Sequence, residues 1–278
     1  MTAASLAPSE GRAAVGRVRR VLPVTRFVLL STQRSGTSWL MERLSKHPAV
    51  GGYGEALLHD ARGPFGWPVG AGDRSFFPQY LSERGISATN SQRHLHLFGY
   101  LDDLYAPRRS LRAIGFKLMY DEARPYPELL VYFSLRDVRV VHLLRLNLLD
   151  IVISRVAMRQ RRFVHAHSPE ERESVRIRLP TDRLPLWLAR LALERGAARL
   201  LVRAARLKVH EVTYEDLLAD DVHLRRTLAF LGIADAADLD LTSLLLKLGS
   251  PSQRSSVTNY DEVCARLRRT AFACFLRD

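Results

Sequence analysis

The sequence predicts an α/β domain in which a mostly parallel sheet lies between helices on both faces, and three observations support this. The apolar run at 27–30 ends in a polar, glycine-containing turn and is followed by a helical pattern that reaches Leu44. A second run, at 138–144, leads into a helical pattern at 148–158. With 47% apolar and 26% charged residues among 278, the composition fits one sizeable soluble core. Repeated strand-to-helix switches are typical of parallel α/β sheets.

The remaining elements follow in order along the chain. Further strand patterns lie at 49–55, 114–119 and 208–213. Helical patterns lie at 80–105, where the signal is weak, and at 184–207, 221–232 and 260–276. A glycine predicts the end of the helix at 221–232. Three stretches lack either pattern: 59–78, rich in Gly, Pro and aromatics, the charged stretch 160–178, and the polar stretch 250–259.

The terminal residues and the cysteines indicate how the chain is divided into domains and which compartment it occupies. Residues 1–25 predict a disordered tail, with an organelle transit peptide as the alternative, and 26–278 predict a single domain. Cys264 and Cys274 are the only cysteines and lack C-x-x-C spacing, which predicts buried free thiols in a reducing, cytoplasmic compartment. No apolar run approaches the length of a membrane span.

The formal net charge of +13 predicts an anionic partner, which leaves nucleotide, nucleic acid, acidic glycan and membrane surface open. The loop at 32–38 narrows this choice, because free backbone N–H groups and a helix N-terminus suit a phosphate-like group. Arg34 adds a cation there, and Thr37 and Ser38 add hydroxyl donors. The loop is not a Walker A motif, since its only cation precedes the glycine. An ordinary helix cap is the alternative.

Two more polar segments, each with an arginine and one or two serines, predict that the ligand has a second anionic group. Arg145 ends a strand and Ser154 lies two helical turns further on, so both can face one phosphate. Arg254, followed by two serines in a late loop, is a third candidate. Ligands of parallel α/β sheets bind beyond the carboxyl ends of the strands, so we expect the first two junctions to line one crevice. A surface ion pair and a helix-interior serine are the alternative for Arg145 and Ser154.

These residues carry a family resemblance. The stretch S-T-Q-R-S-G-T-S-W-L at 31–40 resembles the 5′-phosphosulfate loop of sulfotransferases that use 3′-phosphoadenosine 5′-phosphosulfate (PAPS). Residues 144–154 resemble their 3′-phosphate motif, V-T-Y-E-D-L at 212–217 resembles the segment after it, and N-Y-D-E-V at 259–263 is similar to a tail of bacterial members. The resemblance implies a P-loop nucleotide-binding-like sulfotransferase fold.

The resemblance also implies roles for individual residues. The positions that would bind the 5′-phosphosulfate are Arg34, Ser35, Gly36, Thr37 and Ser38. Arg145 and Ser154 would hold the 3′-phosphate, although they are one residue further apart than in the cytosolic aryl and steroid branch. Trp39 and Tyr214 match positions that contact adenine. PAPS would be the donor, 3′-phosphoadenosine 5′-phosphate (PAP) the product, and no metal is implied.

The residue expected to act as general base resembles that of a carbohydrate-type branch of sulfotransferases and not that of the cytosolic branch. Cytosolic members place a histidine where this chain has Met119, while Lys117 is kept. The segment at 47–58 is instead similar to the H-P-x-V…G-E segment of tyrosylprotein, trehalose and nodulation-factor sulfotransferases, which implies that Glu55 is the base. Arg34 and Lys117 would stabilise the charge that develops during in-line transfer. A helix cap or an ion pair with an arginine is the alternative for Glu55.

The expected acceptor is a hydroxyl of a carbohydrate, glycolipid or small metabolite, with residues 65–77 and 160–178 on the acceptor side. No nucleic acid and no membrane span are expected, and an oligomer is left open. One alternative is a P-loop phosphotransferase, which needs a Walker lysine and a magnesium-binding acid. A basic nucleic-acid-binding protein is another, and a sulfotransferase fold without catalysis is a third.

Overall fold

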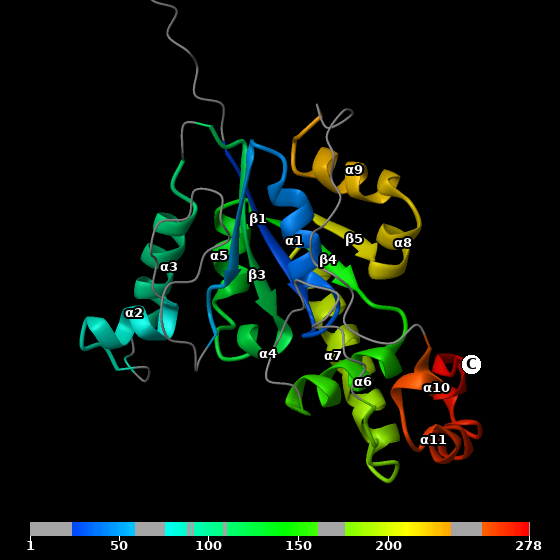
Figure 1. Ribbon diagram of the computed structural model, residues 1–278. Helices are drawn as coiled ribbons and strands as arrows, with labels where there is room; N and C mark the ends of the chain where they lie inside the picture. The colour runs from blue at the N-terminus through cyan, green and yellow to red at the C-terminus, as the bar shows by residue number, and fades with distance from the viewer. Residues whose placement is uncertain are drawn as a thin grey trace, which may run out of the picture.

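In the computed structural model, the described residues form a five-stranded, all-parallel sheet in the order β2-β3-β1-β4-β5 (Figure 1). The structure describes residues 24–58, 76–87, 90, 92–107, 110–160, 176–234 and 252–277. The strands are β1 (Thr25–Ser31), β2 (Val50–Glu55), β3 (Ala113–Met119), β4 (Arg139–Leu144) and β5 (Val209–Thr213). The predicted α/β class with a parallel sheet is confirmed.

The central strands are covered on both faces, which explains their continuous apolar runs. In β1, Phe27, Val28 and Leu29 are all inaccessible to solvent although successive side chains point to opposite faces. Phe27 and Leu29 belong to one core cluster and Val28 to another. The edge strand β5 is only partly buried.

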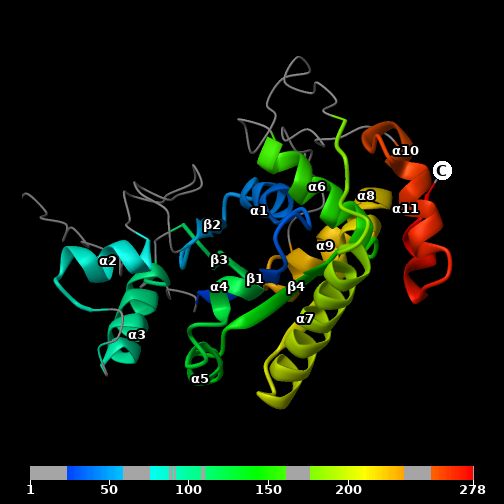
Figure 2. The same ribbon diagram turned by 90° about the horizontal axis from the view of Figure 1, so that it is seen from below.

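Two helical layers complete the domain. On one face, α1 (Thr37–Ser45), α8 (Tyr214–Ala219) and α9 (Asp221–Phe230) pack against Phe27 and Leu29. On the other face, α3 (Arg93–Leu104), α5 (Leu129–Leu135) and the end of α7 (Leu184–Ala204) pack against Val28. α2 (Phe77–Glu83) joins that second cluster, and α4 (Tyr120–Ala123) follows β3 directly. Figure 2 shows the long α7, and it shows that α2 and α3 lie on the opposite side of the molecule from the C-terminal helices.

A third apolar cluster lies beside the carboxyl end of β4. It joins α6 (Leu148–Gln160) and α7 to Val257, which follows α10 (Gln253–Ser256), and to α11 (Tyr260–Leu267) and the 3₁₀ helix η2 (Ala271–Phe275). The side-chain amide of Asn147, just before α6, donates to the Phe275 carbonyl at 2.8 Å. The C-terminal helices are therefore attached to the helix that follows β4.

The strand order places three loops at one end of the sheet. From β1 the chain goes to the edge strand β2, returns through β3 beside β1, and then continues on the other side of β1 with β4 and β5. The direction of the chain across the sheet thus reverses at β1, and such a reversal opens a crevice beyond the strand ends. The loops after β1, β3 and β4 all contribute to it, through Thr32, Tyr120 and Arg145.

Several local predictions differ from the structure. The predicted helix at 260–276 is broken after Leu267, because the Thr270 hydroxyl donates to the Leu267 carbonyl and accepts from the Phe272 N–H. The predicted loop at 250–259 contains α10, which Ser252 caps. The short helices α4 and α5 were not predicted. Cys264 is buried as expected, but Cys274 is exposed. The predicted glycine end of α9 is confirmed, with Gly232 at φ +83°.

Other predictions fall wholly or partly outside the described residues. These are the disordered tail except for its last two residues, positions 59–75 of the aromatic segment, and positions 161–175 of the charged stretch. The described end of the aromatic segment packs in the core, because Phe77 is fully buried against Tyr100 and Tyr126. Phe77 therefore does not line an acceptor cleft, contrary to the prediction. Among the described helices, none is both long and apolar enough to cross a bilayer.

Candidate active site

The loop between β1 and α1 forms a concave turn at the centre of the crevice. Arg34 and Gly36 both have positive φ, at 70° and 93°, so the backbone reverses twice before α1 begins at Thr37. Gly36 is the N-cap and has no side chain to accept from the first N–H groups of the helix. A Cβ on Gly36 would lie 2.5 Å from Tyr214 Cδ2, so the turn and the close approach of Tyr214 both require glycine.

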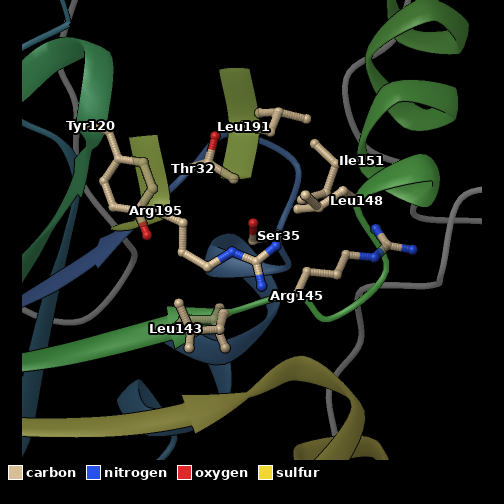
Figure 3. Close-up of a pocket in the computed structure, with 10 residues that line it drawn as sticks. Thr32, Ser35, Tyr120, Leu143, Arg145, Leu148, Ile151, Leu191 and Arg195 are labelled. Atoms are coloured by element: carbon tan, nitrogen blue, oxygen red, sulfur yellow. The ribbon is translucent and has the colours of Figure 1, made fainter. Parts of the chain in front are cut away.

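Three buried donors around this loop lack an acceptor among the residues that the structure describes. They are the Ser35 hydroxyl, Arg145 Nε and Arg155 Nε. Ser35 is completely buried and lines a small pocket together with Arg145 and Arg195, whose guanidinium group points toward it (Figure 3). Buried donors without acceptors are costly. Donors of this kind require acceptor atoms, and the oxygens of an anionic ligand are acceptors.

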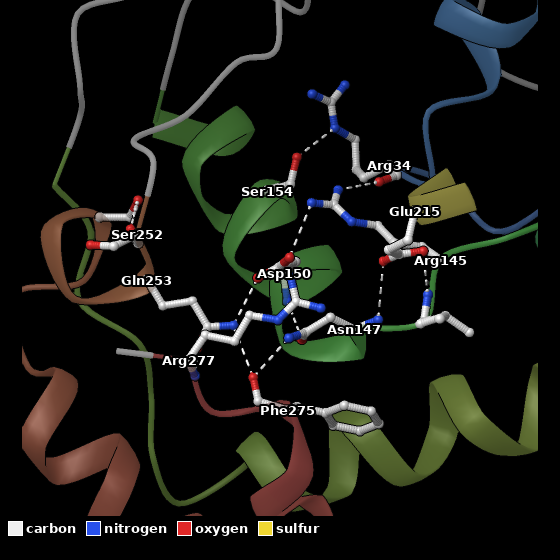
Figure 4. A network of polar contacts seen from close by, with 12 residues as sticks. Arg34, Arg145, Asn147, Asp150, Ser154, Glu215, Ser252, Gln253, Phe275 and Arg277 are labelled. Atoms are coloured by element: carbon white, nitrogen blue, oxygen red, sulfur yellow. Dashed lines mark hydrogen bonds and ion pairs between the residues drawn. The ribbon is translucent and has the colours of Figure 1, made fainter. Parts of the chain in front are cut away.

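The predicted second anion site adjoins the first. Arg34 Nε donates to Ser154 Oγ at 3.0 Å, and Arg145 Nη1 donates to the Arg34 carbonyl at 3.1 Å (Figure 4). Arg145 and Ser154 thus meet through Arg34 and not through a direct bond. Arg145 Nη2 also contacts Asp150 Oδ2 at 3.3 Å. The expectation that the loops after β1 and β4 line one crevice therefore agrees with the geometry.

Two further arginines reach the loop and were not identified from the sequence. Arg155 Nη2 donates to Thr32 Oγ1 at 2.7 Å, and Arg195 lines the pocket from α7. Burial lowers the pKa of both guanidinium groups, although arginine stays charged at neutral pH. The position of Arg155 next to Ser154 could have indicated it. No local pattern indicates Arg195, because only packing brings α7 beneath the loop.

The two residues predicted to contact adenine lie together. The rings of Trp39 and Tyr214 meet edge to face, with centroids 5.6 Å apart. Arg145 Cζ lies 5.1 Å from the centre of the Tyr214 ring, and Arg43 Cζ lies 4.8 Å from that of Trp39. Burial raises the pKa of Tyr214, so this tyrosine is neutral. The aromatic pair therefore adjoins the loop through Gly36 and the second anion site through Arg145.

Glu55 and Lys117 lie at the carboxyl ends of the neighbouring strands β2 and β3. Lys117 Nζ is 3.2 Å from Glu55 Oε1 and donates to Ser38 Oγ at 3.0 Å. The lysine side chain is 7% exposed and that of Glu55 24%. Lys117 therefore connects the carboxylate, which solvent can reach, to the first turn of α1. Met119, where cytosolic sulfotransferases place a histidine, is fully buried.

Arg254 lies on α10 and faces the C-terminal helix. It pairs with Asp261 at 3.0 Å and lies 5.1 Å from the centre of the Tyr260 ring. Its neighbour Gln253 instead reaches the second anion site, because Gln253 Nε2 donates to Asp150 Oδ1 at 2.8 Å (Figure 4). Gln253, which was not predicted from the sequence, thus connects α10 to Arg145 through Asp150.

A metal site is not evident in the described part of the chain, where His, Cys, Asp and Glu form no group of three or more that could hold an ion. Asp121 comes close to the loop, and its Oδ2 accepts from the Gln33 side chain at 3.1 Å. The polar groups around the loop are thus mainly donors and cations, which suit an anion.

Comparisons with known proteins give only distant likenesses. No protein-family model matches the sequence, and no curated protein matches it. Among solved structures, a sulfotransferase from Alicyclobacillus acidocaldarius shares 17% identity at a TM-score of 0.44, over 80% of this chain and 86% of that one. The sulfotransferase domain from the curacin biosynthetic pathway shares 14% identity at a TM-score of 0.41, over 76% of this chain and 75% of that domain. At these values the function has to be argued from the site.

Proposed function

We propose that this protein is a sulfotransferase that moves a sulfuryl group from PAPS to a hydroxyl group of a carbohydrate, glycolipid or small metabolite. The observation that carries the proposal is the Lys117 ammonium, which contacts the Glu55 carboxylate on one side and Ser38 of the anion loop on the other. A base for the acceptor is thereby held next to the group that would receive the donor. The resemblance at 31–40 and 144–154 supplies the identity of the donor.

The residues around the loop fit a nucleotide with two separated anionic groups. The N-terminus of α1 and the buried Ser35 hydroxyl would hold the 5′-phosphosulfate. Arg145 and Ser154 would hold the 3′-phosphate, and Arg34, which contacts both of them, would hold the 5′-phosphosulfate beside it. The edge-to-face pair of Trp39 and Tyr214 offers an aromatic surface for adenine.

The chemistry requires one proton acceptor and several fixed positive charges. The bound donor supplies the activated sulfuryl group, so that a new bond forms between sulfur and the acceptor oxygen while the bond from sulfur to the phosphate oxygen breaks. Glu55 takes the proton of the acceptor hydroxyl. The Lys117 ammonium and the backbone N–H groups of the loop stabilise the charge that grows on the leaving phosphate oxygen. PAP leaves as the product.

The choice of acceptor rests on family resemblance. The H-P-x-V…G-E segment, which supplies Glu55, is similar to that of tyrosylprotein, trehalose and nodulation-factor sulfotransferases, and the last two act on carbohydrates. A carbohydrate hydroxyl is accordingly the first acceptor class to screen, with glycolipids and small glycosylated metabolites after it.

Calorimetric titration tests the donor site directly. PAP, AMP and ATP are titrated into the protein without magnesium. We expect PAP to bind at least about tenfold more tightly than AMP, which corresponds to about 1.4 kcal/mol for the second anionic group. Equal affinity for PAP and AMP would remove the argument for a second anion site. A preference for ATP that appears only with magnesium would favour a phosphotransferase instead.

A further inference from the structure

We propose that Gln253 is a positioning residue for Arg145 and that, through Asp150, it sets the preference of the nucleotide site for a 3′-phosphate. This inference rests on the proposed function, in which Arg145 binds that phosphate. Gln253 lies 103 residues after Asp150 in the chain and belongs to none of the segments at 31–40, 47–58, 144–154 or 212–217. The packing of α10 beside α6 brings the two side chains together.

The side-chain amide of Gln253 has a partner on each side. Its Nε2 donates to Asp150 Oδ1 at 2.8 Å and to the Phe275 carbonyl at 2.9 Å, while its Oε1 accepts from the Arg277 N–H at 3.0 Å (Figure 4). A carboxylate and a carbonyl only accept and a backbone N–H only donates, so these partners allow one orientation of the amide. The residue is 5% exposed. Gln253 is therefore fixed between the C-terminal residues and α6.

Asp150 passes this restraint on to Arg145. Its Oδ1 accepts from Gln253, and its Oδ2 lies 3.3 Å from Arg145 Nη2. The Asp150 N–H donates to Asn147 Oδ1 at 3.2 Å, which fixes the backbone at the start of α6. The two oxygens of one carboxylate thus have different partners, one on α10 and one in the turn after β4.

This division leaves Arg145 able to bind a phosphate. Its Nη1 donates to the Arg34 carbonyl at 3.1 Å and its Nη2 contacts Asp150, whereas its Nε is buried and has no acceptor among the described residues. A carboxylate with both oxygens available binds a guanidinium group through two parallel hydrogen bonds, as a phosphate does. Gln253 opposes such pairing, because it holds one of the two Asp150 oxygens. Asp150 therefore orients Arg145 without occupying its remaining donor.

Gln253 also attaches the C-terminal residues to α6, and this structural role has to be separated from its effect on Arg145. Other contacts hold the same elements in place. Asn147 Nδ2 donates to the Phe275 carbonyl at 2.8 Å, and a parallel bridge joins Val257, which follows α10, to Ile177. We therefore expect a Gln253 variant to fold, so that its nucleotide affinities can be measured.

The test is calorimetric titration of PAP and AMP into the wild type and into Gln253→Met, whose side chain has a similar length but no amide. We expect Gln253→Met to bind PAP about 3- to 10-fold more weakly and AMP with unchanged affinity, because the released Asp150 carboxylate competes with the 3′-phosphate for Arg145. A structural role alone predicts the same change for both nucleotides. An equal change for PAP and AMP, or no change, would overturn the inference.

A double-mutant cycle shows whether the effect passes through Arg145. In the background of Arg145→Ala, Gln253→Met should change PAP affinity by less than about twofold, because no guanidinium group remains to be oriented. The same is expected in the background of Asp150→Ala, which lacks the connecting carboxylate. A loss in either background as large as the loss in the wild type would show that Gln253 acts by another route and would overturn the inference.

The matched control is Gln79→Met, because Gln79 donates to Glu83 at 2.8 Å within α2 and is not among the proposed site residues. This variant should keep the affinities of the wild type for PAP and AMP. A loss of PAP preference in Gln79→Met equal to that in Gln253→Met would remove the assignment to Gln253.

Failure of the inference and failure of the proposed function give different results. If the wild type prefers PAP and Gln253→Met keeps that preference, the role of Gln253 fails and the donor site stands. If the cycle shows the expected coupling but no sulfuryl group is transferred to any acceptor, the role of Gln253 stands and the proposed reaction fails. If the wild type binds PAP and AMP equally, both fail.

Discussion

Substitution of Gly36 by alanine tests the geometry of the loop more directly than any change of charge. Two costs follow from the structure. The residue lies at φ +93°, where an L-amino acid is strained by about 1 kcal/mol. A Cβ there would also lie 2.5 Å from Tyr214 Cδ2 and 2.7 Å from Cε2, and overpacking of this kind costs about 1–3 kcal/mol. Gly36→Ala should therefore reduce the free energy of unfolding by about 2–4 kcal/mol.

Gly85 supplies a matched control, because it has φ +65° and, among the described residues beyond its chain neighbours, no atom lies within 4 Å of its hypothetical Cβ. Gly85→Ala should lose only the backbone term, about 1 kcal/mol. Urea unfolding measures both free energies, and PAP titration measures whether the loop still binds. Gly36→Ala should weaken PAP binding and Gly85→Ala should not. Equal destabilisation of the two variants within about 0.5 kcal/mol would refute the proposed contact between Gly36 and Tyr214.

Two further predictions concern the proposed roles of single charges. Glu55→Gln should lower kcat by about 10²- to 10⁴-fold with PAP affinity unchanged, because an amide cannot remove the proton from the acceptor hydroxyl. Turnover equal to that of the wild type in a sulfuryl-transfer assay would exclude Glu55 as the base. Arg145→Ala should weaken the binding of PAP more than that of AMP, because Arg145 lies at the proposed site of the 3′-phosphate, which AMP lacks. Calorimetry measures both affinities, and an equal loss of affinity for the two nucleotides would contradict the assignment. Arg136→Ala is the control for that experiment, since Arg136 pairs with Asp102 and is not among the proposed site residues.

The parts of the fold that could be predicted are those whose environment produces a recognisable pattern in a short stretch of sequence. β1 and β4 are buried on both faces, so their sequences are mainly apolar, with His142 as a buried exception in β4. α4 and α5 are 4 and 7 residues long, too short for a helical period to stand out. The break after Leu267 depends on one hydroxyl, that of Thr270, whose residue type is common inside predicted helices as well as at their ends.

The same division applies to the candidate site. The loop at 32–38 could be found because a strand, a glycine and a helix follow one another within a few residues. Glu55 and Lys117 were identified through family resemblance. Arg195 was missed, because it reaches the loop only when α7 packs against the sheet. Short motifs therefore indicated where the ligand would bind, whereas tertiary packing supplied additional charged groups.

Lys117 has a consequence for how the two sides of the site communicate. Its single ammonium is shared between Ser38, on the donor side, and Glu55, on the acceptor side. An anion bound at the loop competes with the Glu55 carboxylate for this ammonium, because both groups are negatively charged. The orientation of the Glu55 side chain therefore depends on whether the donor loop is occupied. A single lysine is thus enough to make the donor side and the acceptor side of the site interdependent.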